Sequence, residues 1–331
     1  MIRKTLNTVA LSAALCLSAL PSQALETVVY QLDWLPGGDK APVYVAQQKG
    51  FFKELGLEVK IAQGKGSTDA ITKIAAGHAD VGRSDIVALL AAKASNTIPV
   101  TGVMNVFSEA PYAFFTVKGR GVESIQDLAE KTVASSPFTS SNLFFPYVVT
   151  KNGLEESGIR HVKANPGSLA PMLLHGRTDA ITSWVTDTVT IQTEAEKIGL
   201  QVNIFPWYGA GLNIYSSSVI ANDQFLKDRP DVAKRFLQAL KKGMIYTWQH
   251  PEEAGEMVHQ VVPEVDPVVA ANTIMSIRQL VHNPSSEAHG LGNFEKNKLA
   301  ETWRLIALAQ DIDPAKLDPE SAISRDFVEA N

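Results

Sequence analysis

The 331-residue chain contains a single cysteine, Cys16, and this scarcity excludes several kinds of site. Cys16 lies in a short apolar segment near the start of the chain. If that segment is removed, the remaining chain can form no disulfide, no thiolate metal site and no cysteine nucleophile. A thiol-free exported protein of this size fits the bacterial periplasm, where a large core can fold without disulfides.

Long hydrophobic runs and a surplus of basic residues are also lacking. No stretch reaches the roughly 20 apolar residues that a membrane-spanning helix needs. The chain has 30 Lys and Arg against 35 Asp and Glu, a net charge of −5, and no basic run. Nucleic acids and anionic membrane surfaces are therefore poor partners.

Local signatures of catalysis and metal binding are absent as well. The chain has no Gly-x-Ser-x-Gly, P-loop or Gly-x-Gly-x-x-Gly motif. Its seven histidines are scattered, and neither cysteine nor paired carboxylates accompany His282 and His289. Zinc sites need such ligands at short spacing. The residues alone therefore predict no catalytic residue, no cofactor and no metal ligand.

The first 24 residues have the features of a secretory signal peptide. Arg3 and Lys4 form a short basic start, residues 9–20 are apolar and small, and Ser22-Gln23-Ala24 is a small-x-small cleavage site. We expect cleavage near Ala24 and export to the periplasm. Because this segment carries two basic residues and no acid, its removal would change the net charge from −5 to −7.

The rest of the chain alternates between strand-like and helix-like patterns. This rhythm predicts an α/β fold with a mostly parallel sheet covered by helices. After residue 223 the pattern becomes mainly helical, which suits packing on the outside of the first part of the fold. Predicted strands include 27–32, 57–62, 98–106, 201–205 and 214–220, and predicted helices include 42–55, 67–77, 230–248, 251–262 and 294–310.

A repeated unit predicts two facing lobes. Residues 66–80 and 167–179 each begin with Gly-Ser at a predicted helix start and end with Gly-x-x-Asp before a predicted strand. The pentapeptide Thr-Asp-Ala-Ile-Thr also occurs twice, at Thr68–Thr72 and Thr178–Thr182, but at different places in the unit. We therefore interpret the identical letters as coincidence and the surrounding unit as the repeat.

The chain is predicted to cross between the lobes twice. We assign residues 25–110 and 219–331 to lobe 1 and residues 111–218 to lobe 2, with crossings near 109–114 and 216–220. Two crossing strands make a hinge, which permits closure around a ligand. The alternative is two independent domains in series, but no Pro/Gly/Ser-rich linker separates the halves.

The candidate ligand-binding residues follow the predicted strands. In α/β sheets, ligands bind beyond the carboxyl ends of the strands. In lobe 1 these positions hold Trp34, Lys40, Gly66, Ser67, Ser84, Asp85 and Glu109. In lobe 2 they hold Phe138, Thr139, Ser140, Ser183, Trp184, Asp187, Tyr208, Asn213 and Tyr215.

Helix starts and aromatic rings suggest how such a site would hold a ligand. Gly66 lets backbone approach a ligand at a helix N-terminus, where free N–H groups carry partial positive charge. Trp34 and Trp184, next to polar residues, are suited to sandwich a flat molecule. For Phe138 and Tyr208, core packing is an equal alternative.

Charged and hydroxyl side chains would set the ligand's orientation. Ligand amino groups can donate hydrogen bonds to Asp85, Glu109 and Asp187. Lys40 can pair with a ligand carboxylate or donate to a ligand carbonyl. Each has an ordinary alternative, because charges are often simply solvated and a serine such as Ser67 often caps its own helix.

Six segments carry a resemblance to a known family. They are Gln31–Trp34, Pro42–Phe52, Gly64–Ser67, Ala75–Gly82, Val122–Leu128 and Ile220–Leu226. With them the chain resembles the periplasmic substrate-binding proteins of ABC importers, over most of residues 27–310. The similar branch is the thiamine-pyrimidine-precursor group, which is related to sulfonate, taurine and nitrate binders.

The resemblance implies a type II periplasmic binding protein fold with two lobes, a hinge and a central ligand cleft. It further implies a monomer without enzymatic activity, which captures a small ligand and delivers it to an ABC permease in the inner membrane. Pyrimidine binders tend to carry a histidine before the first helix, whereas this chain has Asp39-Lys40. A lysine there would favour an anionic or carbonyl-bearing ligand, so a sulfonate, taurine or nitrate binder stays an alternative.

Two further alternatives belong to other functional classes. The fungal pyrimidine synthases share the resemblance and are enzymes with a cysteine-rich motif and an active-site histidine. This chain has no cysteine after Cys16 and no histidine in residues 64–72, so we expect no enzymatic activity. A ligand-sensing module that contacts a receptor instead of a permease stays open.

Overall fold

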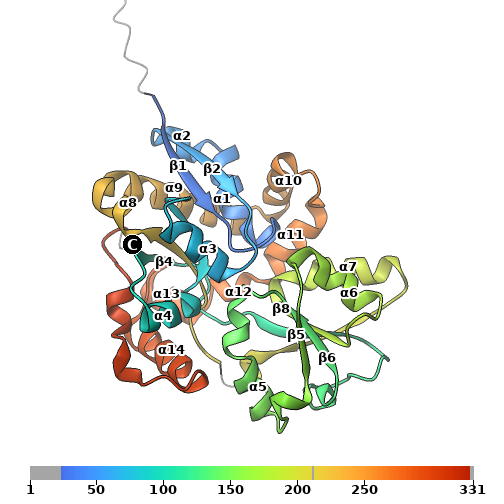
Figure 1. Ribbon diagram of the computed structural model, residues 1–331. Coiled ribbons are helices and arrows are strands. Elements are labelled where there is room, and N and C mark those ends of the chain that lie inside the picture. Colours follow the sequence, from blue (N-terminus) through green and yellow to red (C-terminus); the bar gives the residue numbers. More distant parts are fainter. Residues whose placement is uncertain (1–23, 211, 329–331) are drawn as a thin grey trace, which may run out of the picture.

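The computed structural model describes residues 24–210 and 212–328. These residues form two lobes, each built on a five-stranded sheet covered by helices (Figure 1). The α/β class predicted from the sequence is therefore confirmed. Residues 1–23, which contain Cys16 and nearly all of the predicted signal peptide, lie outside the described residues. Within the described residues, no helix combines the length and apolarity needed to cross a membrane.

The two sheets have the same arrangement of strands. In spatial order, the lobe 1 sheet contains β2 (Leu57–Ala62), β1 (Glu26–Gln31), β3 (Val81–Asp85), β10 (Ser217–Asn222) and β4 (Val100–Asn105). The lobe 2 sheet contains β7 (Arg160–Lys163), β6 (Thr132–Ser135), β8 (Ala180–Trp184), β5 (Tyr112–Val117) and β9 (Val202–Pro206). In each sheet the first three strands are parallel, and the fourth runs antiparallel to both of its neighbours.

The antiparallel fourth strand of each sheet is the one that follows a crossing between the lobes. The chain leaves lobe 1 after β4 and enters lobe 2 at β5, and it returns to lobe 1 at β10. The two crossing segments lie side by side, because the amide of Phe107 donates to the carbonyl of Ser217 and the amide of Ser216 donates to the carbonyl of Phe107. The boundary expected between residues 218 and 219 falls inside β10.

Helices from both ends of the sequence cover the sheets. Lobe 1 carries α1 (Ala41–Gln48), α2 (Phe51–Glu54), α3 (Ser67–Ala75), α4 (Ile86–Ser95), α8 (Asp223–Asp228), α9 (Pro230–Gln249), α10 (Pro251–Val261), α11 (Pro267–Ser276), α12 (Arg278–Val281), α13 (Pro284–His289) and α14 (Lys296–Ala309). Lobe 2 carries α5 (Phe145–Lys151), α6 (Pro166–Leu174) and α7 (Thr188–Lys197). Short 3-10 turns lie at Gly38–Lys40, Ile125–Leu128, Ser140–Leu143, Glu156–Gly158, Val185–Asp187, Trp207–Ala210, Pro314–Lys316 and Pro319–Ala322.

The helix predicted over residues 42–55 is two helices. Gly50 adopts φ +77°, a left-handed conformation that glycine tolerates and that ends α1 before α2 begins. The resulting corner directs Phe52 into the core, where its ring stacks on Phe236 of α9 at 5.2 Å between centroids. The C-terminal helices thus pack on lobe 1, as their amphipathic pattern predicts.

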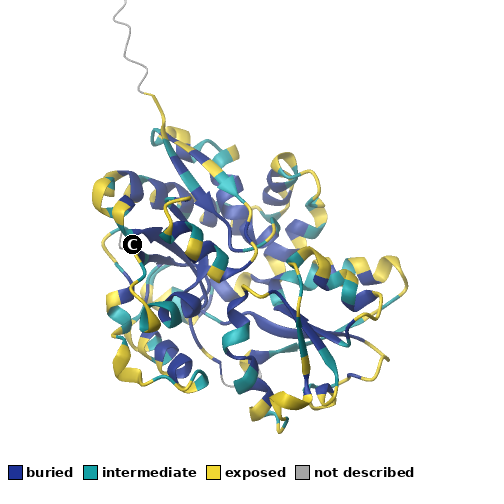
Figure 2. Cartoon of the chain, in the orientation of Figure 1, coloured by how far each residue is buried: buried dark blue, intermediate teal, exposed yellow. Residues whose placement is uncertain are grey.

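The sheets form the buried centre of each lobe, and the outer helix faces are exposed (Figure 2). Every residue of β5 and β10 is buried, which explains the near-continuous apolar run of Tyr112–Val117. Trp248 and Trp303 are core residues, each 4% exposed. The lobes are also in contact through helices, because α11 of lobe 1 packs against α7 of lobe 2.

The Gly-x-x-Asp repeat has one structural role in both lobes. The Asp80 carboxylate accepts the amide of Val29 at 2.8 Å, and the Asp179 carboxylate accepts the amide of Thr132 at 2.8 Å. Each aspartate therefore ties the start of its strand to the parallel neighbour. The Gly-Ser halves of the repeat are not equivalent, because Gly66 precedes α3 whereas Gly167 lies within the first turn of α6.

Candidate ligand site between the lobes

A cavity lies between the lobes, at the carboxyl ends of the parallel strands. It is narrow: the roughly 340 Å³ of empty space includes open solvent at its mouth, and only about 20 Å³ is open to the centres of water-sized molecules. Lobe 1 contributes Asp33, Trp34, Lys40, Gly66 and Ser67, and lobe 2 contributes Thr139, Ser183, Trp184, Thr186 and Asp187. The strand-end rule used on the sequence therefore leads to this place in the fold.

Lys40 lies at the bottom of the cavity between two aspartates. Its ammonium is 2.6 Å from a carboxylate oxygen of Asp33 and 2.6 Å from one of Asp39. Lys40 and Asp33 are each only 2% exposed. Because two carboxylates already neutralise this one cation, Lys40 offers no net positive charge to a ligand.

Asp33 is buried, and one of its carboxylate oxygens lacks a hydrogen-bond donor. Burial alone would raise the pKa of Asp33, but the Lys40 and Arg83 cations outweigh burial and hold that pKa below its usual value. Asp33 is therefore ionised at neutral pH. Its second oxygen, Oδ2, is buried and has no hydrogen-bond partner among the described residues. A buried carboxylate oxygen without a donor is costly, so a donor on a ligand or on water would complete it.

Arg83 supports this charged group from behind the cavity. Its guanidinium donates to the carbonyl of Asp39 at 2.5 Å and to the hydroxyl of Ser217 at 2.6 Å, and it lies 4.7 Å from the centre of the Phe107 ring. These contacts fix the turn that carries Asp39 and Lys40. Arg83 is 3% exposed and does not line the cavity.

Two tryptophans, one from each lobe, form the aromatic walls. Trp34 is half-buried and packs against the apolar core of lobe 2, although it belongs to lobe 1. Trp184 ends β8, and its ring contacts Tyr112 edge-on at 6.0 Å and lies 5.9 Å from the Lys40 ammonium. Rings in these positions present flat apolar surface to a ligand held between the lobes.

Asp187 is the titratable group of lobe 2 in the cavity. Burial raises its pKa to about 6, with the nearby Asp39 charge adding to the effect, while a hydrogen bond from Ser183 and the Lys40 charge oppose it. The carboxyl group of Asp187 can therefore change charge near neutral pH. In either state it faces the cavity as a hydrogen-bonding group.

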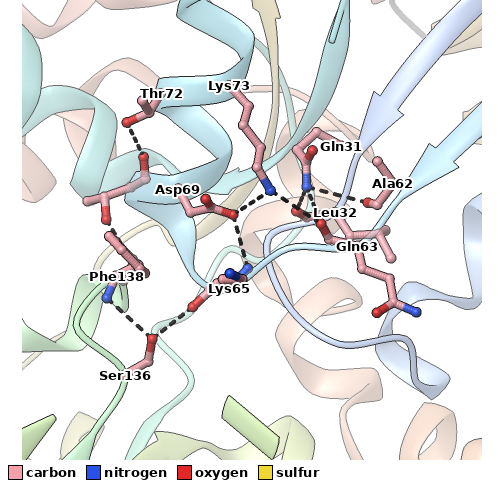
Figure 3. Close-up of polar contacts among 11 residues, drawn as sticks. Gln31, Leu32, Ala62, Gln63, Lys65, Asp69, Thr72, Lys73, Ser136 and Phe138 are labelled. Carbon is pink, nitrogen blue, oxygen red and sulfur yellow. Dashed lines mark hydrogen bonds and ion pairs between the residues drawn. The ribbon is translucent and has the colours of Figure 1, made fainter. Parts of the chain in front are cut away.

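The loop after β6 reaches across the cleft to the start of α3. The Ser136 hydroxyl donates to the carbonyl of Lys65 at 2.8 Å (Figure 3). The amide and hydroxyl of Thr68 donate to the carbonyl of Phe138 at 3.2 and 3.1 Å. Only glycine fits at position 66, because a Cβ there would lie 2.3 Å from the backbone of Phe138. The structure is thus a closed arrangement of the lobes.

Three predicted site residues lie in a buried layer behind the cavity. Ser84, Asp85 and Ser140 are all 0% exposed. The Ser84 hydroxyl donates to the carbonyl of Ser67 at 3.1 Å, and the amide of Asp85 donates to the Ser67 hydroxyl at 3.2 Å. Ser84 and Asp85 thus position Ser67, the Ser140 hydroxyl donates to Asp85 at 2.6 Å, and none of the three lines the cavity.

Five other predicted residues do not line the cavity. Phe138 is 41% exposed and Tyr208 is 61% exposed, Glu109 is half-buried, Asn213 accepts a hydrogen bond from Lys298 at 2.8 Å, and the Tyr215 hydroxyl accepts the amide of Glu295 at 2.7 Å. We expected residues 214–220 to be a strand ending at the cleft. The strand begins only at Ser217, so residues 213 and 215 lie against the segment that begins α14.

Asp33 and Thr186 line the cavity although the sequence reasoning did not select them. Both had a usable signal, because Asp33 precedes Trp34 after the first strand and Thr186 lies between Trp184 and Asp187. In the described part of the chain, no group of three or more His, Cys, Asp or Glu is arranged to hold a metal.

Comparison with known proteins decides the family. The family described as NMT1/THI5 like matches residues 38–254, which is more than half of the chain. The chain belongs to the NMT1/THI5-like family. This confirms the resemblance found in the sequence.

The curated relatives and solved structures that resemble this chain carry two kinds of name. The 4-amino-5-hydroxymethyl-2-methylpyrimidine phosphate synthase of Legionella pneumophila is 25% identical over 246 residues, 72% of this chain and 74% of that protein. The riboflavin-binding protein RibY of Chloroflexus aurantiacus is 22% identical over 312 residues, 92% of this chain and 86% of that protein. The alkanesulfonate-binding protein SsuA of Xanthomonas axonopodis, solved with MOPS bound, has a TM-score of 0.71 and 14% identity, with 91% of this chain and 98% of that chain covered.

These comparisons confirm the periplasmic binding protein fold and correct one expectation. Other solved structures with this fold include sulfonate- and nitrate-binding proteins. The expectation that the chain lacks enzymatic activity is contradicted, because several curated relatives carry the synthase name. The absence of cysteine and of a histidine in residues 64–72 was too narrow a basis for it, since it tested only one arrangement of catalytic groups.

Proposed function

We propose that the protein captures a small flat ligand between its lobes by hinge closure and presents it to an ABC permease. The observation that carries this proposal is the cavity lined from both lobes, with Trp34 on one side and Trp184 on the other. A ligand that touches both lobes stabilises the closed state over the open one, and its affinity for the closed state sets the size of that shift.

The charges around the cavity favour a ligand that donates hydrogen bonds. Lys40 is neutralised by Asp33 and Asp39, the second oxygen of Asp33 lacks a donor, and Asp187 adds another acceptor when ionised. An amino-substituted ring would satisfy these acceptors and stack on the tryptophans. A sulfonate or nitrate would meet acceptors of its own sign, and Lys40, the cation that lines the cavity, is already paired. The site thus supports a thiamine-pyrimidine-like ligand over the anionic alternative.

The synthase names of the relatives support a second candidate, in which the bound molecule is chemically changed. The titratable side chains that line the cavity are Asp33, Lys40 and Asp187. A general acid or base works best with a pKa near the operating pH, so Asp187, with a pKa of about 6, is the group suited to proton transfer. Under this candidate, Asp187→Asn would abolish turnover.

A thermal-shift experiment tests the ligand class. We expect 4-amino-5-hydroxymethyl-2-methylpyrimidine to raise the melting temperature, since at a hundredfold excess over Kd a ligand adds about 2.7 kcal/mol of stability. Taurine, an alkanesulfonate and nitrate at equal concentration are the comparison compounds. A shift with the anions and none with the pyrimidine would refute the proposed ligand class.

Recovery of the ligand separates capture from chemistry. After incubation, the protein is denatured and the released molecule is analysed by mass spectrometry. Unchanged pyrimidine is the expected result for a binding protein, whereas a new mass that disappears in Asp187→Asn would establish the synthase candidate.

Export to the periplasm is part of the proposal and has its own test. The first 24 residues have the pattern of a signal peptide, and solved proteins of this fold include periplasmic binding proteins. We expect the protein in an osmotic-shock fraction, with Leu25 as its first residue by N-terminal sequencing. Retention in the cytoplasm with an intact N-terminus would contradict export.

A further inference from the structure

Asp85 is a buried carboxylate whose partners come from both lobes and from a crossing segment. It ends β3 in lobe 1, and its Oδ1 caps α4 by accepting the amide of Val87 at 3.0 Å. Its Oδ2 accepts three hydroxyl groups, from Tyr112 at 2.5 Å, Ser140 at 2.6 Å and Ser216 at 3.0 Å. This fully buried carboxylate therefore accepts four hydrogen bonds.

The three hydroxyl donors differ in how they would respond to opening. Ser216 precedes β10 and Tyr112 begins β5, so both lie at the crossings about which the lobes would turn. Ser140 lies in the 3-10 turn of lobe 2, beyond the crossings. Rotation of the lobes about the crossings would therefore remove Ser140 from Asp85 while Tyr112 and Ser216 stay near it.

Within residues 24–210 and 212–328, no cation forms a hydrogen bond or ion pair with Asp85. Its hydrogen-bonding neighbours are the hydroxyls of Tyr112, Ser140 and Ser216 and the amide of Val87, and its own amide donates to Ser67 of α3. Tyr112 is the titratable group in contact with it, and burial together with the Asp85 charge raises the pKa of Tyr112 well above normal, so Tyr112 stays neutral. Burial likewise raises the pKa of Asp85 to about 6, against the opposing hydroxyl hydrogen bonds.

The same residues adjoin the ligand cavity on both sides of the cleft. Ser67, which receives the Asp85 amide, lines the cavity in lobe 1. Thr139, the neighbour of Ser140, lines it in lobe 2. Contact between Ser140 and Asp85 therefore joins the lobe 1 wall and the lobe 2 wall of the cavity.

We propose that the Ser140–Asp85 hydrogen bond is an inter-lobe latch that sets the fraction of closed protein in the absence of ligand. The latch presupposes the hinge closure of the proposed function but not the identity of the ligand. A hydrogen bond to a buried carboxylate is strong, and its loss costs more than that of a neutral pair. Removal of the Ser140 hydroxyl should lower the ratio of closed to open protein about tenfold.

Distances between spin labels on the two lobes test the latch in the ligand-free protein. With Cys16→Ser removing the single native cysteine, Glu196→Cys in α7 and Glu256→Cys in α10 place one label on each lobe, and both positions are exposed. Double electron–electron resonance then measures the distance distribution. We expect Ser140→Ala to increase the share of long distances.

Ser218→Ala is the matched control. Ser218 is also a fully buried serine, but its hydroxyl donates to the carbonyl of Ser216 in its own chain segment and does not join one lobe to the other. Its removal should leave the distance distribution unchanged, with both variants folded by circular dichroism. A Ser140→Ala distribution equal to that of the parent, or an equal change in Ser218→Ala, overturns the latch. Failure of every compound in the thermal-shift experiment would count against the proposed ligand and leave this measurement unaffected.

Discussion

Replacing Lys40 with methionine tests whether the charge of this lysine is neutralised by ion pairs within the protein. Lys40→Met keeps a similar length and removes the ammonium that lies 2.6 Å from both Asp33 and Asp39. Lys40 and Asp33 are almost fully buried, so water cannot replace the lost cation without opening the structure. The substitution therefore leaves two carboxylates with Arg83 as their remaining nearby cation.

The expected loss of stability follows from these distances. At 2.6 Å and an effective dielectric constant of about 20, each pair has a Coulomb energy of about 6 kcal/mol. Desolvation of the charges offsets much of this, and breaking a buried pair by removing one partner typically costs about 3–5 kcal/mol. We expect Lys40→Met to lower the free energy of unfolding by about that amount at pH 7.

The pH dependence of the loss has a definite sign. In the native protein the pKa of Asp33 is lowered, so Asp33 contributes stability at neutral pH that is lost as the pH falls through its folded pKa. Loss of Lys40 removes its lowering contribution, so burial shifts the pKa of Asp33 upward in the variant. The variant then gains stability, relative to the native protein, as the pH falls. The difference between the two proteins should therefore shrink from pH 7 to pH 4.

Urea unfolding followed by tryptophan fluorescence measures both effects. Lys73→Met is the control, because Lys73 pairs with Asp69 at 2.8 Å at a partly exposed site and should cost less than about 1 kcal/mol. A loss below about 1 kcal/mol for Lys40→Met, or a loss that grows toward pH 4, would refute the reasoning. In that case Lys40 would be free to bind an anionic ligand.

Three further predictions concern the cleft. Trp34→Ala and Trp184→Ala should each weaken binding of the cognate ligand at least tenfold, about 1.4 kcal/mol, as measured by isothermal titration calorimetry. Unchanged affinity in both variants would refute the site assignment. Gly66→Ala should weaken binding at least tenfold, because its Cβ would meet the Phe138 backbone and its φ of +149° is nearly restricted to glycine, while Gly77→Ala, at the milder left-handed φ of +74° and with no neighbour within 4 Å, should bind normally; normal binding by Gly66→Ala would refute this. Burial raises the pKa of Asp85 to about 6, so Asp85 contributes stability that is present below about pH 4 and lost as the pH rises through 6; the unfolding free energy of native protein relative to Asp85→Asn should fall by up to about 3 kcal/mol from pH 4 to pH 7, and a rise would contradict this assignment.

Features that depend on short-range sequence patterns were predictable from the sequence. The strand and helix periodicities led to the α/β class, and the strand-end rule led to Trp34, Ser67 and Trp184, because parallel strands expose their carboxyl ends at one edge of the sheet. The Gly-x-x-Asp repeat was predictable for the same reason. Asp80 and Asp179 act on the neighbouring strand of their own lobe, at a spacing set by one helix and one turn.

Residues whose role depends on partners far along the chain were not predictable. Tyr215 was predicted to lie at the cleft because its segment has the pattern of a strand. In the structure its hydroxyl accepts a hydrogen bond from the amide of Glu295, in the C-terminal region. Ser140 was taken as a ligand contact, whereas its hydroxyl donates to Asp85, 55 residues earlier. Such pairings depend on how the lobes meet, and no local spacing encodes that.

The amino-acid sequence by itself determined the two-lobed α/β architecture and the edge of each sheet at which a ligand site would form. These follow from short-range periodicity and from the geometry of parallel strands. The tertiary structure decided which side chains at that edge are available. Lys40 reads as a free cation in sequence, but the folded chain holds it between Asp33 and Asp39. Burial strengthens these pairs and withdraws the charge from the ligand, so the chemistry of the cleft is set by contacts that only the folded lobes create.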